Sequence, residues 1–233
     1  MGVYLKHIPI KEMSGKVIVK ESTIDIEKEK FEQSLSIGGD NELYKKSVFF
    51  DLEHYVYKKP ICIGVFGAGY YDEKNDKLII TQYMIENKHE LEKILILSKE
   101  YFENMRNKLK KEYVVTFSGN NDYIVIDYLL KKYKLNYTLE DYFQSIDLQK
   151  KYEQVKQKSI GLKALEGECN ITRESEIISG STLAKTFGKI MKDDMYFSRM
   201  PIEKKEKILL YNMQDVVSLF HIYTQWNKYV RPE

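Results

Sequence analysis

The sequence has few of the residues that mark secreted, zinc-binding or membrane proteins. Its 233 residues include two cysteines, Cys62 and Cys169, and neither belongs to a C-x-x-C pair. This spacing argues against a disulfide framework and against a structural zinc site, and we expect two buried free thiols in a reducing compartment. No stretch approaches the roughly 18 consecutive apolar residues of a membrane span. We expect no membrane association.

An excess of one charge is also lacking, because 37 basic residues nearly cancel 35 acidic ones and leave a net charge of +2. Charge alone does not mark the chain as a nucleic-acid binder, so such a role would need local basic patches. The first ten residues lack a long apolar run, which argues against a signal peptide and predicts a cytoplasmic protein.

Phosphate-binding loops are missing too, since neither G-x-x-x-x-G-K-[ST] nor G-x-G-x-x-G occurs. The glycine-rich segment 64–69 leads into Tyr70-Tyr71, which we interpret as a turn and not as the start of a helix. Nucleotide hydrolysis by a P-loop is not supported. The four histidines have no metal-ligand spacing between them.

What the sequence does have is enough apolar residues, 43%, for one large α/β domain. Residue type and spacing predict strands over residues 48–53, 61–66, 78–83, 113–117 and 145–148. They predict helices over residues 90–110, 122–132, 148–156, 162–169, 182–191 and 202–229. Short links between the first three strands indicate an antiparallel meander, and the later strands alternate with helices. This order of strands and helices resembles that of the ribonuclease H-like fold, and the resemblance implies a mixed sheet of five strands, with two parallel strands after the meander, flanked by helices.

We divide the chain into an N-terminal extension, residues 1–46, and a domain over residues 47–233. The extension is polar and mixed, with a short strand expected at 17–19, a helix at 27–35 and a turn at 36–40.

Acidic residues at three places form the candidate site. Asp51 and Glu53 share one face of the first strand of the domain, about 7 Å apart along it. Two acids among aromatic and aliphatic neighbours need a compensating cation. The alternative is that Asp51 marks the end of the strand and Glu53 is solvated.

Asp122 follows Gly119-Asn120-Asn121 at the start of a helix, where an Asp is commonly an N-cap. Tyr211 and Asp215 lie one turn apart on the last helix, in a strongly apolar segment. For Asp215 the alternative is a surface acid beside a core tyrosine.

Taken together, these motifs resemble the tyrosine branch of the DEDD exonuclease superfamily. The phrases that carry the narrower resemblance, to YprB-like ribonuclease H-like domains, are Val48-Phe49-Phe50-Asp51-Leu52-Glu53, Phe117-Ser118-Gly119-Asn120-Asn121-Asp122, Gly161-Leu162-Lys163-Ala164-Leu165-Glu166 and Leu210-Tyr211-Asn212-Met213-Gln214-Asp215-Val216. Two features differ from that family: His54 replaces a threonine after D-x-E, and Gly119 and Asp122 are one residue closer than usual.

The resemblance implies a 3′→5′ exonuclease that uses two Mg²⁺ or Mn²⁺ ions. Asp51 would bridge both ions, Glu53 and Asp215 would complete one site, and Asp122 would serve the other. Tyr211 would orient the attacking water. All-carboxylate ligation suits these hard cations better than zinc. The implied substrate is DNA or RNA, entered at a single-stranded 3′ end.

Several alternatives stay open from the sequence. A catalytically silent nucleic-acid-binding or scaffold domain could keep the fold, and an endonuclease of the same fold is a further reading. His54 could contact phosphate or water in the site, or could simply pack. The lysines that could contact phosphates, or form a solvated face, are Lys150, Lys151, Lys156, Lys158 and Lys163.

Overall fold

The computed structural model describes residues 17–26, 28–173 and 179–231. Six strands form one mixed sheet in the order β1-β4-β3-β2-β5-β6. The strands are β1 (Ile18–Asp25), β2 (Ser47–Tyr57), β3 (Lys59–Asp72), β4 (Lys77–Met84), β5 (Tyr113–Thr116) and β6 (Gln144–Asp147). Strands β1 to β4 pair antiparallel, whereas β2–β5 and β5–β6 pair parallel. The expected meander followed by two parallel strands is confirmed.

The helices are α1 (Leu91–Asn107), α2 (Asn120–Lys132), α3 (Leu148–Lys156), α4 (Leu162–Glu168), α5 (Gly180–Ile190), α6 (Ile202–Thr224) and α7 (Trp226–Tyr229). Short 3₁₀ turns cover Lys28–Gln33, Leu43–Lys46, Lys88–Glu90 and Leu139–Asp141. The long C-terminal helix expected over 202–229 is interrupted at Gln225, where α6 ends and α7 begins. In the described part of the chain, we find no helix with the length and apolar character of a membrane span.

The sheet has six strands, not the five predicted, because residues 18–25 form the full-length edge strand β1. Its buried positions alternate with exposed ones: Ile18, Ser22 and Ile24 face the core, while Glu21 faces solvent. An edge strand with one solvated face carries many polar residues, and this masks its period in the sequence. All eight residues of β1 pair with β4.

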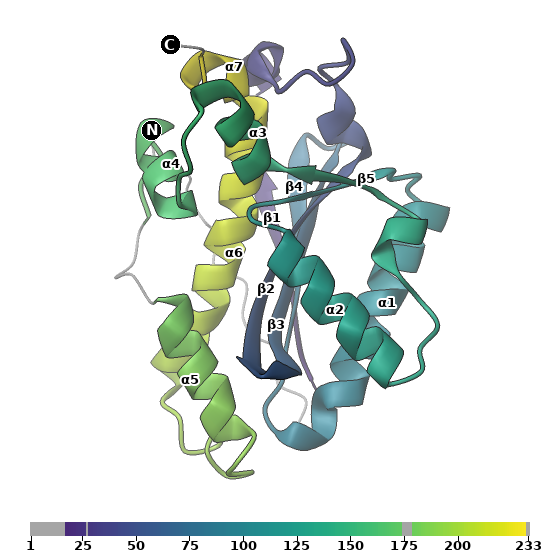
Figure 1. The fold of residues 1–233 in the computed structure, drawn as a ribbon, viewed down its shortest axis with the longest axis vertical. Helices are drawn as coiled ribbons and strands as arrows, with labels where there is room; N and C mark the ends of the chain where they lie inside the picture. The colour runs from purple at the N-terminus through teal and green to yellow at the C-terminus, as the bar shows by residue number, and fades with distance from the viewer. Residues whose placement is uncertain (1–16, 27, 174–178, 232–233) are drawn as a thin grey trace.

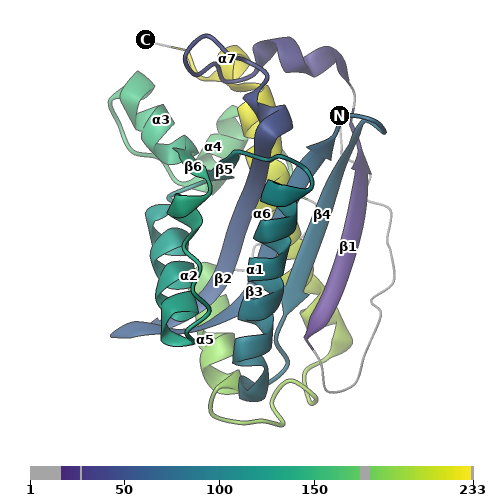
Figure 2. The same ribbon diagram turned by 90° about the vertical axis from the view of Figure 1, so that its right-hand side faces the viewer.

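Helices cover both faces of the sheet (Figures 1 and 2). On one face Phe50 of β2 contacts Phe102 of α1, and on the other Phe49 contacts Phe220 of α6. The alternation of side chains along β2 therefore sends Phe49, Asp51 and Glu53 toward α6. The sheet and α6 together bury the face that carries the acids.

The strand expected over residues 61–66 is confirmed, but the turn expected at Tyr70-Tyr71 is wrong, because β3 continues through both residues to Asp72. Two glycines of β3, Gly64 and Gly67, make room for a side chain from a covering helix. A Cβ on Gly64 would lie 2.4 Å from the ring of Phe187 in α5, and one on Gly67 would lie 2.0 Å from Oδ1 of Asn212 in α6. The glycines thus allow α5 and α6 to approach the sheet closely.

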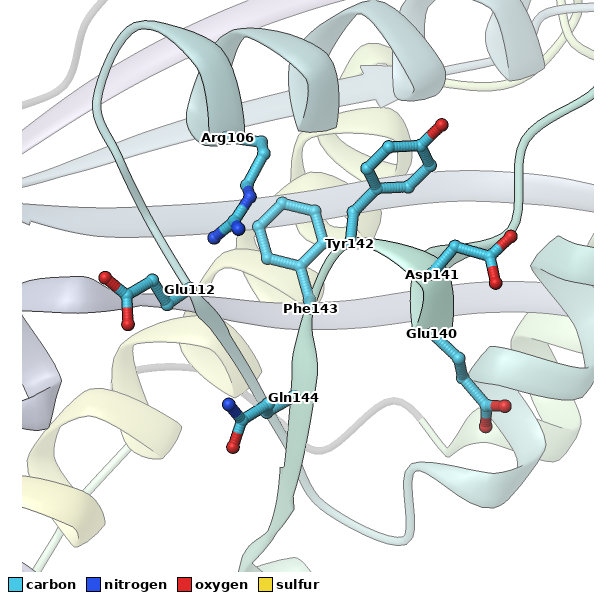
Figure 3. Close-up of a pocket in the computed structure, with 7 residues that line it drawn as sticks. All are labelled: Arg106, Glu112, Glu140, Asp141, Tyr142, Phe143 and Gln144. Atoms are coloured by element: carbon cyan, nitrogen blue, oxygen red, sulfur yellow. The ribbon is translucent and has the colours of Figure 1, made fainter.

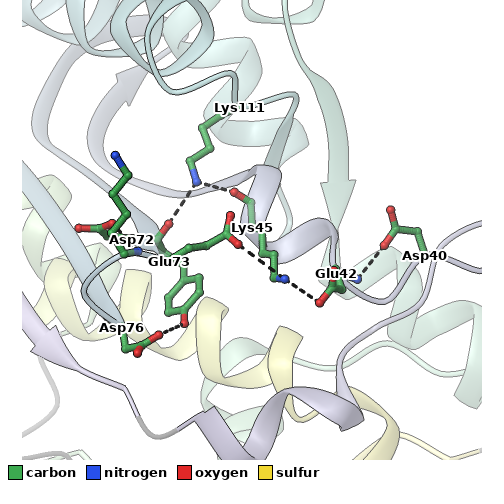
Figure 4. A network of polar contacts seen from close by, with 9 residues as sticks. Asp40, Glu42, Lys45, Asp72, Glu73, Asp76 and Lys111 are labelled. Atoms are coloured by element: carbon green, nitrogen blue, oxygen red, sulfur yellow. Dashed lines mark hydrogen bonds and ion pairs between the residues drawn. The ribbon is translucent and has the colours of Figure 1, made fainter.

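A buried lysine ties the beginning of β2 to the end of β3 (Figure 4). The Lys111 ammonium donates to the carbonyls of Lys45, at 2.5 Å, and Tyr71, at 3.2 Å. Burial lowers the pKa of Lys111 to about 8. Around it, Lys45 pairs with Glu42 and Glu73, and Tyr71 donates to Asp76. Residues before position 47 thus contribute directly to the packing of the sheet.

Candidate metal centre

The middle of β2 supplies two carboxylates to one buried place. Asp51, Glu53 and Asp215 each offer one ligand oxygen, and these atoms all lie within 4.8 Å of one another. Glu53 is 6% exposed and Asp215 is 5% exposed. The alternatives of a solvated Glu53 and a surface Asp215 are therefore wrong.

Electrostatics in this cluster are those of crowded like charges. Burial and the neighbouring Asp215 raise the pKa of Asp51 well above its ordinary value. Burial, then Asp51 and Asp215, do the same to the pKa of Glu53. Burial raises the pKa of Asp215 to about 6, although the Arg173 guanidinium opposes the rise. Without a cation, the negative charges of these carboxylates repel one another and are poorly solvated. A bound cation would relieve both effects.

Asp122 lies beside the cluster, in the first turn of α2. It is 7% exposed, and burial and the charges of Asp51, Asp147 and Asp215 raise its pKa well above the ordinary value. The expected alternative, an N-cap, is wrong: Gly119 occupies that position. Nδ1 of His54 approaches to 3.9 Å from Oδ1 of Asp122.

The turn that leads to Asp122 is held by Asp147, at the carboxyl end of β6. The Asp147 carboxylate accepts the backbone N–H groups of Ser118 and Gly119, both at 3.1 Å. Ser118 has a φ of 55°, a conformation that non-glycine residues adopt at a cost. A Cβ on Gly119 would lie 1.9 Å from Oγ1 of Thr116. Several contacts therefore fix where α2 begins.

Tyr211 lies one turn before Asp215 on α6, and two cationic side chains lie near its ring. Nζ of Lys163 lies 5.1 Å from the ring centroid, and Cζ of Arg173 lies 5.2 Å from it. Burial, followed by the charges of Asp215, Glu53 and Asp51, raises the pKa of the Tyr211 hydroxyl. The phenol therefore stays protonated at neutral pH.

A family model described as the RNase_H superfamily matches residues 48–227, more than half of the chain. The chain belongs to the RNase H superfamily. Members of this superfamily act on nucleic acids, usually with divalent metal ions, and membership indicates a nuclease-type activity. Searches of curated proteins and of solved structures found no match.

The residues present fit the divalent metal ions of the RNase H superfamily. Three carboxylates converge, two of them buried and that of Asp51 partly exposed. Burial raises the pKa of each, and the charge of neighbouring acids adds to the rise for Asp51 and Glu53. Hard, oxygen-seeking cations such as Mg²⁺ and Mn²⁺ match an all-carboxylate donor set. The group of three does not include Asp122, so its role as a fourth ligand remains a prediction.

Sequence reasoning missed an amide pair that supports the RNase H-like site. Asn212 donates through Nδ2 to Oδ2 of Asp51 at 2.9 Å and accepts from Nε2 of Gln82 at 2.8 Å. Asp51, Gly67 and Gln82 face one another across β2, β3 and β4. A polar Gln82 inside an apolar strand was the available signal, but its partner lies 130 residues away.

Two further missed residues, Glu166 and Arg173, adjoin Asp215. Arg173 donates through Nε and Nη2 to the Glu166 carboxylate at 2.8 and 2.6 Å. The same Nη2 pairs with Oδ1 of Asp215. Glu166 belongs to the quoted motif of residues 161–166, whereas Arg173 lies in irregular chain with no pattern that singles it out.

A separate pocket lies away from the RNase H-like site (Figure 3). Its residues are Arg106, Glu112, Glu140, Asp141, Tyr142, Phe143 and Gln144. Glu112 precedes β5 and Gln144 begins β6, so the pocket lies at the amino ends of these strands. Asp122 follows the carboxyl end of β5, and Asp147 is the last residue of β6. The pocket therefore lies at the opposite end of these strands from Asp122 and Asp147.

Proposed function

We propose that this protein is a metal-dependent 3′→5′ exonuclease of the tyrosine branch of the DEDD superfamily, similar to YprB-like domains. The observation that carries the proposal is the buried group of Asp51, Glu53 and Asp215, with Tyr211 one turn from Asp215. The pair Asp51 and Glu53 and the pair Tyr211 and Asp215 belong to motifs on which the family resemblance rests. Membership in the RNase H superfamily supports nuclease chemistry in general.

Two Mg²⁺ or Mn²⁺ ions would be held by four carboxylates in this proposal. Asp51, Glu53 and Asp215 would hold one, and Asp51 with Asp122 would hold the other. Bound there, such ions supply charge neutralisation at phosphorus, activation of water and stabilisation of the leaving oxygen. The convergence of the carboxylates would fix where the cations sit.

The remaining side chains orient the reactants. Tyr211 keeps its proton and hydrogen-bonds the attacking water, since its hydroxyl has a raised pKa. Asn212 holds the rotamer of Asp51 through its bond to Oδ2. Lys163, beside the Tyr211 ring, is placed to contact a phosphate of the substrate.

The substrate in this proposal is a single-stranded 3′ end of DNA or RNA, and the product is a nucleoside 5′-monophosphate. A cytoplasmic location belongs to the same proposal. Its support is that Cys62 and Cys169 are both buried free thiols, as expected in a reducing compartment.

The test is a cleavage assay with 5′-labelled single-stranded DNA and RNA, in Mn²⁺, Mg²⁺ or EDTA. The unmutated protein is compared with the Asp51→Asn/Glu53→Gln variant. We expect a ladder that shortens from the 3′ end, only with metal and only with the unmutated protein.

Circular and 3′-blocked substrates separate this activity from its alternatives. Cutting of circles would show an endonuclease. Binding without cleavage, by folded protein under every metal tested, would overturn the enzyme proposal in favour of a binding or scaffold domain.

A further inference from the structure

The third side chain of the acidic group, Asp215, is held from outside the group by an ion-pair chain. Glu166 on α4 grips Arg173 through two parallel hydrogen bonds, at 2.8 and 2.6 Å. Arg173 then directs Nη2 at Oδ1 of Asp215. The order of contacts is carboxylate, guanidinium, carboxylate, and only the last of them belongs to the acidic group.

The series of contacts from Glu166 through Arg173 to Asp215 is largely buried. Glu166 is 3% exposed, and the Arg173 side chain is 9% exposed. The guanidinium also lies over the ring of Tyr211, 5.2 Å from its centroid. The two hydrogen bonds to Glu166 and the contact with the Tyr211 ring fix the plane of the guanidinium independently of Asp215.

We propose that Arg173 is a positioning residue that orients Asp215 as a metal ligand, and that Glu166 holds Arg173 for this purpose. The inference rests on the metal site of the proposed function. Arg173 engages Oδ1 of Asp215, which leaves Oδ2 as the oxygen for the cation. Hydrogen bonds of this kind to ligating carboxylates fix their rotamers and sustain metal affinity.

The balance of charge favours a role for Arg173 in orienting Asp215, rather than competition between Arg173 and a metal ion for Asp215. The negative charge of Glu166 matches the positive charge of Arg173, so the pair adds no net charge to the site. Glu166 therefore offsets part of the repulsion that Arg173 would exert on a cation at Asp215. Arg173 also need not leave, because its principal grip is on Glu166 and not on Asp215.

The test measures Mn²⁺ affinity by isothermal titration calorimetry, with the full chain and without substrate. We expect Arg173→Ala to raise the Mn²⁺ dissociation constant about 10- to 100-fold. Arg173→Lys should recover part of the loss, because an ammonium can donate to Asp215 but cannot grip Glu166 with two parallel bonds. Arg199→Ala is the matched control: Arg199 also pairs with an aspartate, Asp193, but is exposed. It should bind Mn²⁺ as the unmutated protein does.

Circular dichroism on every variant separates misfolding from loss of the ligand. Should Arg173→Ala fail to fold, the double variant Glu166→Met/Arg173→Leu replaces the buried pair with apolar groups that fit a core. We expect the double variant to fold and to show the same weakened Mn²⁺ binding.

Two results would overturn the inference. Unchanged Mn²⁺ affinity in folded Arg173→Ala would make the ion pair a packing element only. Tighter binding would show that Arg173 competes with the cation. Failure of the proposed metal site is distinguishable from both, because the unmutated protein would then bind no Mn²⁺ at all.

Discussion

At the residue scale, the carboxylates of the site repel one another because the fold buries them together. Burial and neighbouring acids raise the pKa of Asp51, Glu53 and Asp122 well above ordinary values. Acids buried together in this way reduce the stability of the protein that carries them. The same repulsion is what a bound cation relieves.

The pH dependence of stability follows from these shifts. A carboxyl whose folded-state pKa is raised stabilises the fold below its unfolded pKa, near 4, and this stabilisation is lost as pH rises through the folded value. For Asp215 that value is about 6. We expect the unfolding free energy of metal-free protein to fall by about 1–3 kcal/mol between pH 5 and pH 8.

Mn²⁺ should counteract this loss, because a cation that binds only the folded state stabilises it. Differential scanning fluorimetry in EDTA and in Mn²⁺ measures both effects. The Mn²⁺-induced rise in melting temperature should be larger at pH 8 than at pH 5. Equal rises at the two pH values would contradict the assignment of these acids to a metal site.

Asp51→Asn tests the central residue. The amide keeps an oxygen that can accept from Asn212, so the fold should be retained. One charge fewer should raise the stability of metal-free protein at pH 8 by about 1 kcal/mol. It should also lower metal-dependent cleavage by about 10³-fold, equivalent to several kcal/mol of barrier.

Melting curves and single-turnover cleavage check the two effects of Asp51→Asn separately. Asp25→Asn is the matched control, because the Asp25 side chain is 79% exposed and lies in the edge strand. A metal-dependent rate that survives in Asp51→Asn would remove Asp51 from the site.

At the element scale, β3 is shaped to receive α6. A Cβ on Gly67 would meet Oδ1 of Asn212 at 2.0 Å. Gly67→Ala should displace Asn212, break its bonds to Asp51 and Gln82, and cost about 1–3 kcal/mol of stability. Gly167→Ala is the control, since α4 has open space there and a helical alanine is favoured by about 0.5–1 kcal/mol.

A double-mutant cycle with Asn212→Ala identifies the cause. Chemical denaturation gives the free energy of each variant. Gly67→Ala should cost less in the Asn212→Ala background, because the clashing amide is gone. Equal costs in both backgrounds would place the strain elsewhere.

The elements that the sequence predicted correctly are those with local patterns. Alternation along β2 placed Asp51 and Glu53 on one face, and the helical period placed Tyr211 and Asp215 one turn apart. The prediction of a turn after the glycines of β3 was wrong, because glycine often marks turns locally. Here the glycines accommodate Phe187 and Asn212. That role depends on a helix more than 100 residues away, and no local pattern encodes it.

The same reason explains the missed polar residues of the site. Arg173 lies in irregular chain, and its partners at positions 166 and 215 meet only in the folded protein. Asp147 looked like an ordinary strand residue, yet it holds the turn before Asp122. Residue types with chemical roles were visible in the sequence, but their pairing was not.

At the scale of the whole molecule, the site is assembled from four distant parts of the chain. Strand β2, the start of α2, the α4 segment with Arg173, and α6 all meet at one face of the sheet. None of these parts precedes residue 47. Among the residues that the structure describes, those before position 47 therefore affect the site through the stability of the sheet that carries it.

Their contribution to that stability is large. Strand β1 covers the edge of β4 along eight residue pairs. Apolar side chains of this region that are buried include Ile24, Leu35, Leu43 and Tyr44. Each such side chain contributes about 1.5–3 kcal/mol when fully buried. The buried Lys111 ammonium also donates to the carbonyl of Lys45, which belongs to this region.

A chain shortened to residues 47–233 should therefore melt roughly 10–20 °C below one shortened to residues 17–233, which keeps all of these contacts. The exposed edge of β4 should also make the shorter chain prone to association, measurable by light scattering. Where both chains are folded, at low temperature, their Mn²⁺ affinities should agree, because the acids and their supports all lie after residue 47. Equal melting temperatures would make residues 17–46 a dispensable extension, and a lost Mn²⁺ affinity in folded 47–233 would show that they also shape the site.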